Sequence, residues 1–201
     1  MRNSHTIGLG TQEPKHGGFQ LYTVVPEILV CSIPDELSFQ RAVVLPLAIS
    51  TAAAGLYQKT HLALPYPTLA PKKTGKTILV WGGGSSVGST VIQLASASGL
   101  TVAAVAANKH HDYAKSLGAT YVFDYKKDSV VEDIITALKG TEIAGAYDAI
   151  GHEQTIKACA QVVSQLGGGK VVSVLPPPEE GLPDNVQAMG RGLFSELSDL
   201  E

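Results

Sequence analysis

The sequence predicts an α/β fold built on a doubly wound parallel sheet with five strands. Short apolar runs rich in β-branched residues alternate with segments of helical apolar spacing across residues 77–175. The connections between them are short, as in right-handed β-α-β crossovers. A glycine cluster also follows the first of these strands and opens directly into a helix, and in a parallel sheet such a turn binds phosphate.

The turn itself, residues 82–88, reads GGGSSVG. The dinucleotide fingerprint is G-x-G-x-x-G, and the register that ends on Gly88 begins on Gly83 and places Ser85 in the middle position. A serine there hinders close approach of the backbone, but its hydroxyl and that of Ser86 can donate to a phosphate oxygen. The alternative interpretation is a turn that only needs glycines for positive φ angles.

The first part of the chain carries weaker signals. Residues 19–25 have strand composition. Ser38 is an expected helix N-cap for residues 39–44, and Pro46 ends that helix and begins another that runs to residue 58. Three prolines in residues 64–76 indicate a boundary, so the predicted division is residues 1–70 and residues 71–201.

The alternation after this boundary assigns each element in turn. The predicted strands are residues 77–81, 101–106, 121–123, 146–150 and 170–175. The predicted helices are residues 86–98, 109–117, 129–138 and 153–165. The remaining tail is short and polar, so no sixth strand is expected. The strand at residues 170–175 would then present an unpaired apolar edge and favour association.

Composition excludes several classes of partner. The 15 basic and 18 acidic residues give a net charge of -3, which offers no electrostatic footprint for nucleic acid. No apolar run of membrane-spanning length is expected, and the N-terminal segment lacks the apolar core of a signal peptide. The two cysteines, Cys31 and Cys159, form no C-x-x-C pair. A cytoplasmic protein with reduced thiols is therefore expected.

The end of the second strand predicts the choice of cofactor. An enzyme that uses NAD usually carries Asp or Glu there for the ribose 2′-hydroxyl. Residues 106–111 read AANKHH, and no carboxylate appears before Asp112. Lys109, with Asn108 and His110 beside it, would attract a 2′-phosphate, so NADP(H) is favoured. The alternative is that these residues are only the solvated start of a helix.

Five segments together carry a family resemblance: FQLYTVVP, LPLAISTAAAGLYQ, TGKTILVWGGGSSVGS, AKSLGATYVFDY and VLPPPEEGLP. They resemble the medium-chain dehydrogenase/reductase superfamily, and more narrowly its fungal zinc-independent branch of quinone-reductase-like proteins and trans-acting enoyl reductases. The resemblance runs from about residue 17 to residue 194. It implies a Rossmann domain, a remnant of a GroES-like catalytic domain in residues 1–70, and NADPH-dependent hydride transfer to an activated C=C or C=O bond.

The resemblance also implies which residues hold NADP(H). Most of them lie at the carboxyl ends of strands or in the loops beyond, as expected for an open α/β sheet. The implied set is Gly83, Gly84, Ser85, Ser86, Val87 and Gly88 at the pyrophosphate, Ala107, Asn108, Lys109 and His110 around the 2′-phosphate, Tyr125 near it, Val174 and Leu175 beside the nicotinamide, and Thr51 from the neighbouring domain.

A catalytic zinc is not expected. By the resemblance, zinc-dependent relatives carry a cysteine ligand four residues before the threonine that matches Thr51, and this chain has Leu47 there. The histidines outside the 2′-phosphate segment, His152 among them, show no ligand spacing and are interpreted as surface or structural residues. No catalytic acid or base is assigned.

Full members of the superfamily have more chain on both sides of the matching region, so a fragment, a shortened gene model and a natural truncation all remain open. The leading hypothesis is an NADPH-dependent oxidoreductase that acts on a small-molecule enone, quinone or acyl substrate. Assembly of the chain into a homo-oligomer is a further expectation. One alternative is a catalytically silent NADPH-binding or interaction module. Another is that the glycine turn binds a different phosphate ligand, such as a flavin or a nucleotide.

Overall fold

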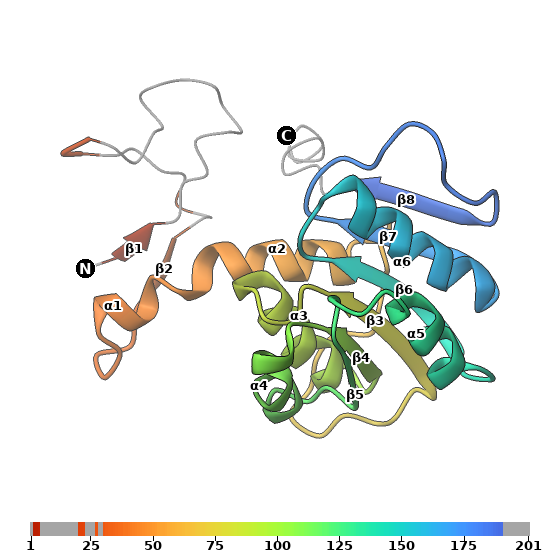
Figure 1. The fold of residues 1–201 in the computed structure, drawn as a ribbon. Helices are drawn as coiled ribbons and strands as arrows, with labels where there is room; N and C mark the ends of the chain where they lie inside the picture. Colours follow the sequence, from red (N-terminus) through yellow and green to blue (C-terminus); the bar gives the residue numbers. More distant parts are fainter. Residues whose placement is uncertain (1, 5–19, 23–26, 28–29, 191–201) are drawn as a thin grey trace. The chain divides into compact units, whose positions relative to one another are not determined.

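A computed structural model describes residues 2–4, 20–22, 27 and 30–190 (Figure 1). The chain forms two compact units, one of Met1–Ala48 with Gly192–Glu201 and one of Ile49–Arg191. The domain boundary near residue 70 stays a prediction. The larger unit contains the parallel sheet and the glycine turn.

In the smaller unit, β1 (Arg2–Ser4) pairs antiparallel with β2 (Val30–Ser32). Most of the strand expected at residues 19–25 lies outside the described residues, and residues 20–22 form a bend. The two predicted helices are confirmed as α1 (Phe39–Ala42) and α2 (Leu45–Tyr57). Pro46 lies in the first turn of α2, where a missing amide hydrogen breaks no helical bond.

The predicted doubly wound parallel sheet is confirmed in the larger unit (Figure 1). Its strands are β3 (Lys76–Trp81), β4 (Thr101–Val105), β5 (Tyr121–Phe123), β6 (Glu142–Asp148), β7 (Gly169–Ser173) and β8 (Val186–Gly190). They are parallel and lie in the order β5-β4-β3-β6-β7-β8. The chain winds outward from β3 to β5 and then returns to β6, so the strand order reverses between β3 and β6.

The sheet has six strands rather than the predicted five. β8 pairs with β7 along its whole length, from Gly169 opposite Val186 to Ser173 opposite Gly190. The predicted unpaired edge on β7 is therefore wrong, and the expected association loses that basis. The segment VQAMG has little strand signal of its own, because its place depends on backbone pairing with β7 and on packing of Val186 and Ala188 against the core.

Helices cover both faces of the sheet. α2, α3 (Ser86–Ala97) and α4 (His111–Ser116) contribute to one core cluster, and α5 (Val130–Leu138) and α6 (Glu153–Gln165) to the other. Successive residues of β3 alternate between the clusters, with Ile78 and Val80 in the first and Leu79 and Trp81 in the second. Burial on both faces explains why the strands read as continuous apolar runs.

One apolar stretch is longer than expected from the sequence. Among the described residues, Phe39–Tyr57 is a helical segment of 19 residues with mean hydropathy 1.4, enough by length and composition to cross a membrane. The core helix of a soluble protein passes the same test. Here Ala52 and Leu56 are fully buried in the core, and a turn at residues 43–44 interrupts the stretch. The segment is therefore weak evidence for a membrane.

Candidate functional site

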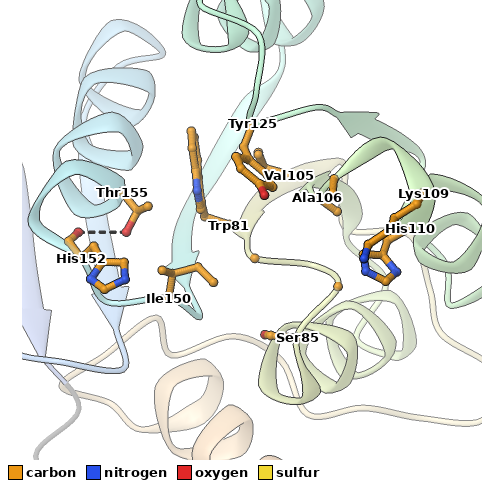
Figure 2. A pocket seen from close by; sticks show the side chains of 13 residues that line it. Trp81, Ser85, Val105, Ala106, Lys109, His110, Tyr125, Ile150, His152 and Thr155 are labelled. Atoms are coloured by element: carbon orange, nitrogen blue, oxygen red, sulfur yellow. Dashed lines mark hydrogen bonds between the residues drawn. The ribbon is translucent and has the colours of Figure 1, made fainter.

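A pocket of about 560 Å³ opens at the carboxyl ends of β3, β4 and β6, where the strand order reverses (Figure 2). Open α/β sheets bind ligands at this switch point, and the volume lies within the usual range for small-molecule sites. The lining residues are Trp81, Gly82, Gly84, Ser85, Val105, Ala106, Ala107, Lys109, His110, Tyr125, Ile150, His152 and Thr155.

The glycine turn forms the floor of this pocket. Gly82 has a φ of +82°, and its amide and that of Gly83 both donate to the carbonyl oxygen of Val105, at 3.0 and 2.9 Å. Ser85 then has extended backbone, and its Oγ accepts a 3.0 Å bond from the amide of Gly88. Ser85 is thus the N-cap of α3, which explains a serine in the middle of the glycine fingerprint.

The first turn of α3 is arranged to receive an anion. The amides of Ser86 and Val87 belong to that turn, where backbone amides have no acceptor within the helix. They lie at the positive end of a 12-residue helix, whose dipole favours negative charge. The hydrogen of the Ser85 hydroxyl is not used in its capping bond, because there the oxygen is the acceptor.

Gly88 brings the helix close to the turn. A Cβ atom at this position would overlap the carbonyl oxygen of Gly82 and lie 2.8 Å from its carbonyl carbon. The last glycine of the fingerprint allows the helix to pack closely against the strand, and Gly88 has this role here. A glycine is therefore required here by space, whatever ligand the turn holds.

A cationic wall follows β4. The 3₁₀ turn Asn108–His110 leads into α4 and carries the exposed side chain of Lys109. The half-buried ring of His110 lies over Gly84, where an added Cβ would be 3.0 Å from the His110 Cδ2 atom. Figure 2 shows Lys109 and His110 together on one side of the pocket. These two side chains can meet a phosphate that the glycine turn presents.

The opposite wall comes from the loop between β6 and α6 and from the first turn of α6. Ile150, His152 and Thr155 line the pocket from this side (Figure 2). They lie next to Asp148, the last residue of β6, whose side chain is completely buried. Burial raises the pKa of the Asp148 carboxyl, and hydrogen bonds from Thr155 and the backbone, together with the nearby His152, oppose this shift.

Part of the predicted cofactor set meets in this pocket. Six of its members line it: Gly84, Ser85, Ala107, Lys109, His110 and Tyr125. Gly83, Ser86, Val87 and Gly88 belong to the same turn and the first turn of α3, and exposed Asn108 belongs to the 3₁₀ turn, but none of these five lines the pocket.

Three predicted residues lie elsewhere. Thr51 is buried in α2, and its carbonyl oxygen accepts a bond from Tyr147. Val174 and Leu175 follow β7, and the side chain of Leu175 contacts Gly151 in the β6–α6 loop. The described pocket includes none of the three, so their contact with a cofactor stays a prediction.

One wall of the pocket was not predicted from the sequence. The fourth strand was predicted to run to residue 150, whereas β6 ends at Asp148 and leaves Ile150 in the loop. His152 was predicted to be a surface or structural residue; it is exposed and also lines the pocket beside Thr155. The carboxyl-end rule that indicated Lys109 applies equally to His152, which follows the predicted strand as well as the observed one. Trp81, Gly82, Val105 and Ala106, at the ends of the first two strands of the sheet, were missed as well.

The described residues contain no group of three or more His, Cys, Asp or Glu side chains placed to hold a metal ion. Leu47, at the position of the zinc-ligating cysteine in the resemblance, is half exposed. Cys159 is fully buried, and burial raises the pKa of its thiol, so it is a poor metal ligand or nucleophile. A zinc-free protein stays a prediction.

The fold and the pocket define a doubly wound α/β protein with a pocket at the switch point of its sheet, and comparison with known proteins supplies the family. The model of the zinc-binding dehydrogenase family matches residues 86–191, more than half of the chain. The chain therefore belongs to this family, within the medium-chain dehydrogenase/reductase superfamily.

The curated relatives of this chain include fungal enoyl reductases and dehydrogenases. The chain is 48% identical over 185 residues to the trans-enoyl reductase himH of Aspergillus japonicus, which covers 92% of this chain and 53% of that protein. It is 41% identical to the dehydrogenase azaJ of Aspergillus niger, over 90% of this chain and 54% of that protein. The chain thus spans about half the length of these relatives.

Solved structures share the fold. The CurK enoyl reductase superposes with a TM-score of 0.62 at 20% identity, covering 86% of this chain and 50% of that one. The quinone oxidoreductase of Thermus thermophilus, solved alone and with NADPH, gives a TM-score of 0.62 at 22% identity, with 87% and 53% coverage. These structures show the shared fold, and the fungal trans-enoyl reductase and dehydrogenase relatives agree with the enoyl-reductase-like branch that the sequence resemblance indicated.

Proposed function

We propose that this chain carries the NADPH-binding part of an oxidoreductase that transfers a hydride to an activated C=C or C=O bond of a small enone, quinone or acyl substrate. The observation that carries the proposal is the switch-point pocket, which joins the capped N-terminus of α3 to the Lys109 side chain. No Asp or Glu lines this pocket to repel a 2′-phosphate.

Each wall has a separate task in this proposal. The amides at the start of α3 and the Ser85 hydroxyl bind the pyrophosphate, and Gly88 lets the helix come close enough for them to do so. Lys109 and His110 bind the 2′-phosphate, with Tyr125 beside it. The bound nicotinamide supplies the redox chemistry, and the protein positions it and shields it from water.

A second candidate is a catalytically silent NADPH-binding module. It is favoured by the roles assigned to the pocket's polar side chains: Ser85, Lys109, His110 and Tyr125 are all assigned to the nucleotide, and none is assigned to a substrate. The shared length of about half of the curated relatives fits either candidate. A cytoplasmic location and assembly into homo-oligomers stay predictions under both.

The tryptophan provides a direct test. Trp81 is the single tryptophan of the chain, is 7% exposed and lines the pocket. Titration with NADPH should quench its emission with a saturable dependence, and calorimetry should give the same dissociation constant. If neither method detects NADPH or NADH, the proposal is wrong. Binding followed by consumption of NADPH with an enone or quinone supports the reductase, whereas binding without turnover across such a panel supports the silent module.

A further inference from the structure

The buried carboxylate of Asp148 stands behind one wall of the pocket and does not line it. Its Oδ1 accepts a 2.9 Å bond from the amide of Ile150. Its Oδ2 accepts a 2.6 Å bond from the Thr155 hydroxyl and a 3.3 Å bond from the amide of Gly151. One side chain therefore binds two amides of the β6–α6 loop and one hydroxyl in the first turn of α6, and two of the residues it binds, Ile150 and Thr155, line the pocket.

Thr155 fixes the start of α6 through this bond. The N-cap residue His152 makes no side-chain capping bond, so the helix lacks the usual anchor of its first turn. The Thr155 Oγ1 lies 2.8 Å from the His152 carbonyl oxygen and 2.6 Å from the Asp148 carboxylate. A hydroxyl has one hydrogen, and the shorter bond to the carboxylate ties this turn to the end of β6.

The loop held in this way contacts the phosphate turn. A Cβ atom at Gly82 would lie 2.7 Å from the Ile150 Cδ1 atom, so the Ile150 side chain packs directly on the glycine turn. The Ala149 amide also donates a 2.9 Å bond to the Trp81 carbonyl oxygen. A displacement of the loop would therefore move both the wall and the floor of the pocket.

The geometry points to Asp148 as a positioning residue for the nucleotide site: through Thr155 and the amides of Ile150 and Gly151, it holds the β6–α6 wall against the glycine turn. The inference rests on the proposed function, because it states how that same site is kept in shape. Desolvation disfavours the ionised form of this buried carboxyl group and therefore raises its pKa. Its three donors offset this, and all three belong to the wall.

The test uses Asp148→Asn, Thr155→Val and the double variant. An asparagine still has an oxygen for the Ile150 amide but cannot accept on its second position, and valine keeps the shape of threonine without the hydroxyl. Each single variant should weaken NADPH binding by about tenfold, the usual effect of one charge-assisted bond. Thr155→Ser should retain wild-type affinity because it keeps the hydroxyl.

The double variant separates positioning from direct contact. Thr155 lines the pocket, so its loss alone could remove a contact with the nucleotide. If Thr155 acts through Asp148, the double variant should bind no more weakly than the weaker single variant, because both break the same link. Fully additive effects would overturn the inference. Ser164→Ala is the matched control: it removes a 2.7 Å bond to Asn185 from the other end of α6 and should leave affinity unchanged.

Hydrogen exchange of the ligand-free chain provides a readout independent of NADPH. Exchange in Asp148→Asn and Thr155→Val should quicken at the amides of Ile150, Gly151 and the glycine turn, and remain at the wild-type rate in the strands. Unchanged exchange at these amides, or wild-type affinity in both variants, would overturn the positioning role. If the wild type binds no NADPH, the proposed function fails, while the exchange result still decides the role of Asp148.

Discussion

The phenolic hydroxyl of Tyr147 donates a 2.8 Å hydrogen bond to the backbone carbonyl oxygen of Thr51, 96 positions earlier in the chain. Tyr147 is fully buried in β6, and Thr51 lies in α2 with 4% of its surface exposed. One turn further along α2, a Cβ atom at Gly55 would overlap the Tyr147 ring. The small residues of α2 therefore allow the helix to approach the central strands closely enough for this bond.

Replacement of Tyr147 by phenylalanine should destabilise the fold. The substitution removes the bond to Thr51 and leaves the ring in place, so the expected loss is about 1 kcal/mol, equivalent to roughly 2–4 °C in melting midpoint. Thermal unfolding followed by circular dichroism measures it. Tyr121→Phe, on a ring that is 38% exposed in the edge strand β5, is the control and should change the midpoint little. Equal midpoints for the two variants would contradict the stabilising contribution assigned to the Tyr147 hydrogen bond.

Gly88→Ala should damage both stability and nucleotide binding. Alanine has the higher helix propensity and would stabilise an ordinary helix position by about 1 kcal/mol. At Gly88 the new methyl group would instead overlap the carbonyl group of Gly82, and overpacking of this kind costs roughly 1–3 kcal/mol. Urea unfolding and NADPH titration measure the two effects.

Gly140→Ala serves as the comparison for that experiment. Gly140 has a φ of +83° and no atom within 4 Å of an added Cβ, so its substitution introduces backbone strain without a clash. It should lower stability by about 1 kcal/mol and leave the affinity for NADPH unchanged, because it lies outside the pocket. A Gly88→Ala protein that binds NADPH as the wild type does would show that close packing of α3 is not needed.

Lys109 should set the preference for NADPH over NADH. One charge-assisted contact contributes roughly 1.5–3 kcal/mol, so the wild type should bind NADPH at least about tenfold more tightly. Lys109→Glu should reverse the preference, because a carboxylate repels the 2′-phosphate. Lys115→Glu makes the same charge change on an exposed residue outside the pocket and should not reverse it. Equal dissociation constants for the two nucleotides in the wild type would reject the prediction.

Removal of metal should have no effect on this chain. Leu47 stands at the position where the resemblance places a zinc-ligating cysteine, and its side chain cannot coordinate zinc. Treatment with a chelator should therefore leave the melting midpoint and the nucleotide affinity unchanged. Elemental analysis of the purified protein is the independent check, and stoichiometric zinc would contradict the prediction.

The fold could be predicted wherever the local pattern and the tertiary packing agree. Residues 121–123 and residues 153–165 were predicted with the bounds that β5 and α6 have. β8 could not be found, because the five residues VQAMG gain their strand conformation by pairing with β7 rather than from their own composition. Non-local pairing of this kind leaves no periodic signal in a short segment.

The candidate site divides in a similar way. Residues next to strong local signals, such as Ser85 and Lys109, were found from the glycine turn and the end of the second strand. In the β6–α6 wall, Ile150 was assigned to the strand, whereas the strand ends at Asp148, where the carboxylate binds the amides of Ile150 and Gly151. Such a side-chain bond competes with strand continuation, and its outcome depends on burial that the sequence alone does not reveal.

The buried Asp148 also predicts a pH dependence of stability. Burial raises its pKa in the folded state above the ordinary aspartate value, so the folded chain binds more protons than the unfolded chain between those two values. The stabilising contribution of this group is fully present below the ordinary value and is lost as the pH rises through the raised one. Besides the hydroxyl of Thr155, two titratable groups face the Asp148 carboxyl group. His152 lowers the pKa of Asp148, and the buried Cys159 thiol has a raised pKa of its own.

Asp148→Asn isolates this contribution, because asparagine does not titrate and all other groups are shared. Urea unfolding of both proteins from acidic to neutral pH should show that the substitution is most destabilising at low pH. The difference should shrink as the pH rises through the raised pKa, by about 1.4 kcal/mol for each pKa unit of the shift. In a His152→Gln background the window should extend to higher pH, since the imidazole no longer opposes the shift. Parallel stability curves for the wild type and Asp148→Asn would show that the Asp148 pKa is the same in the folded and unfolded chain.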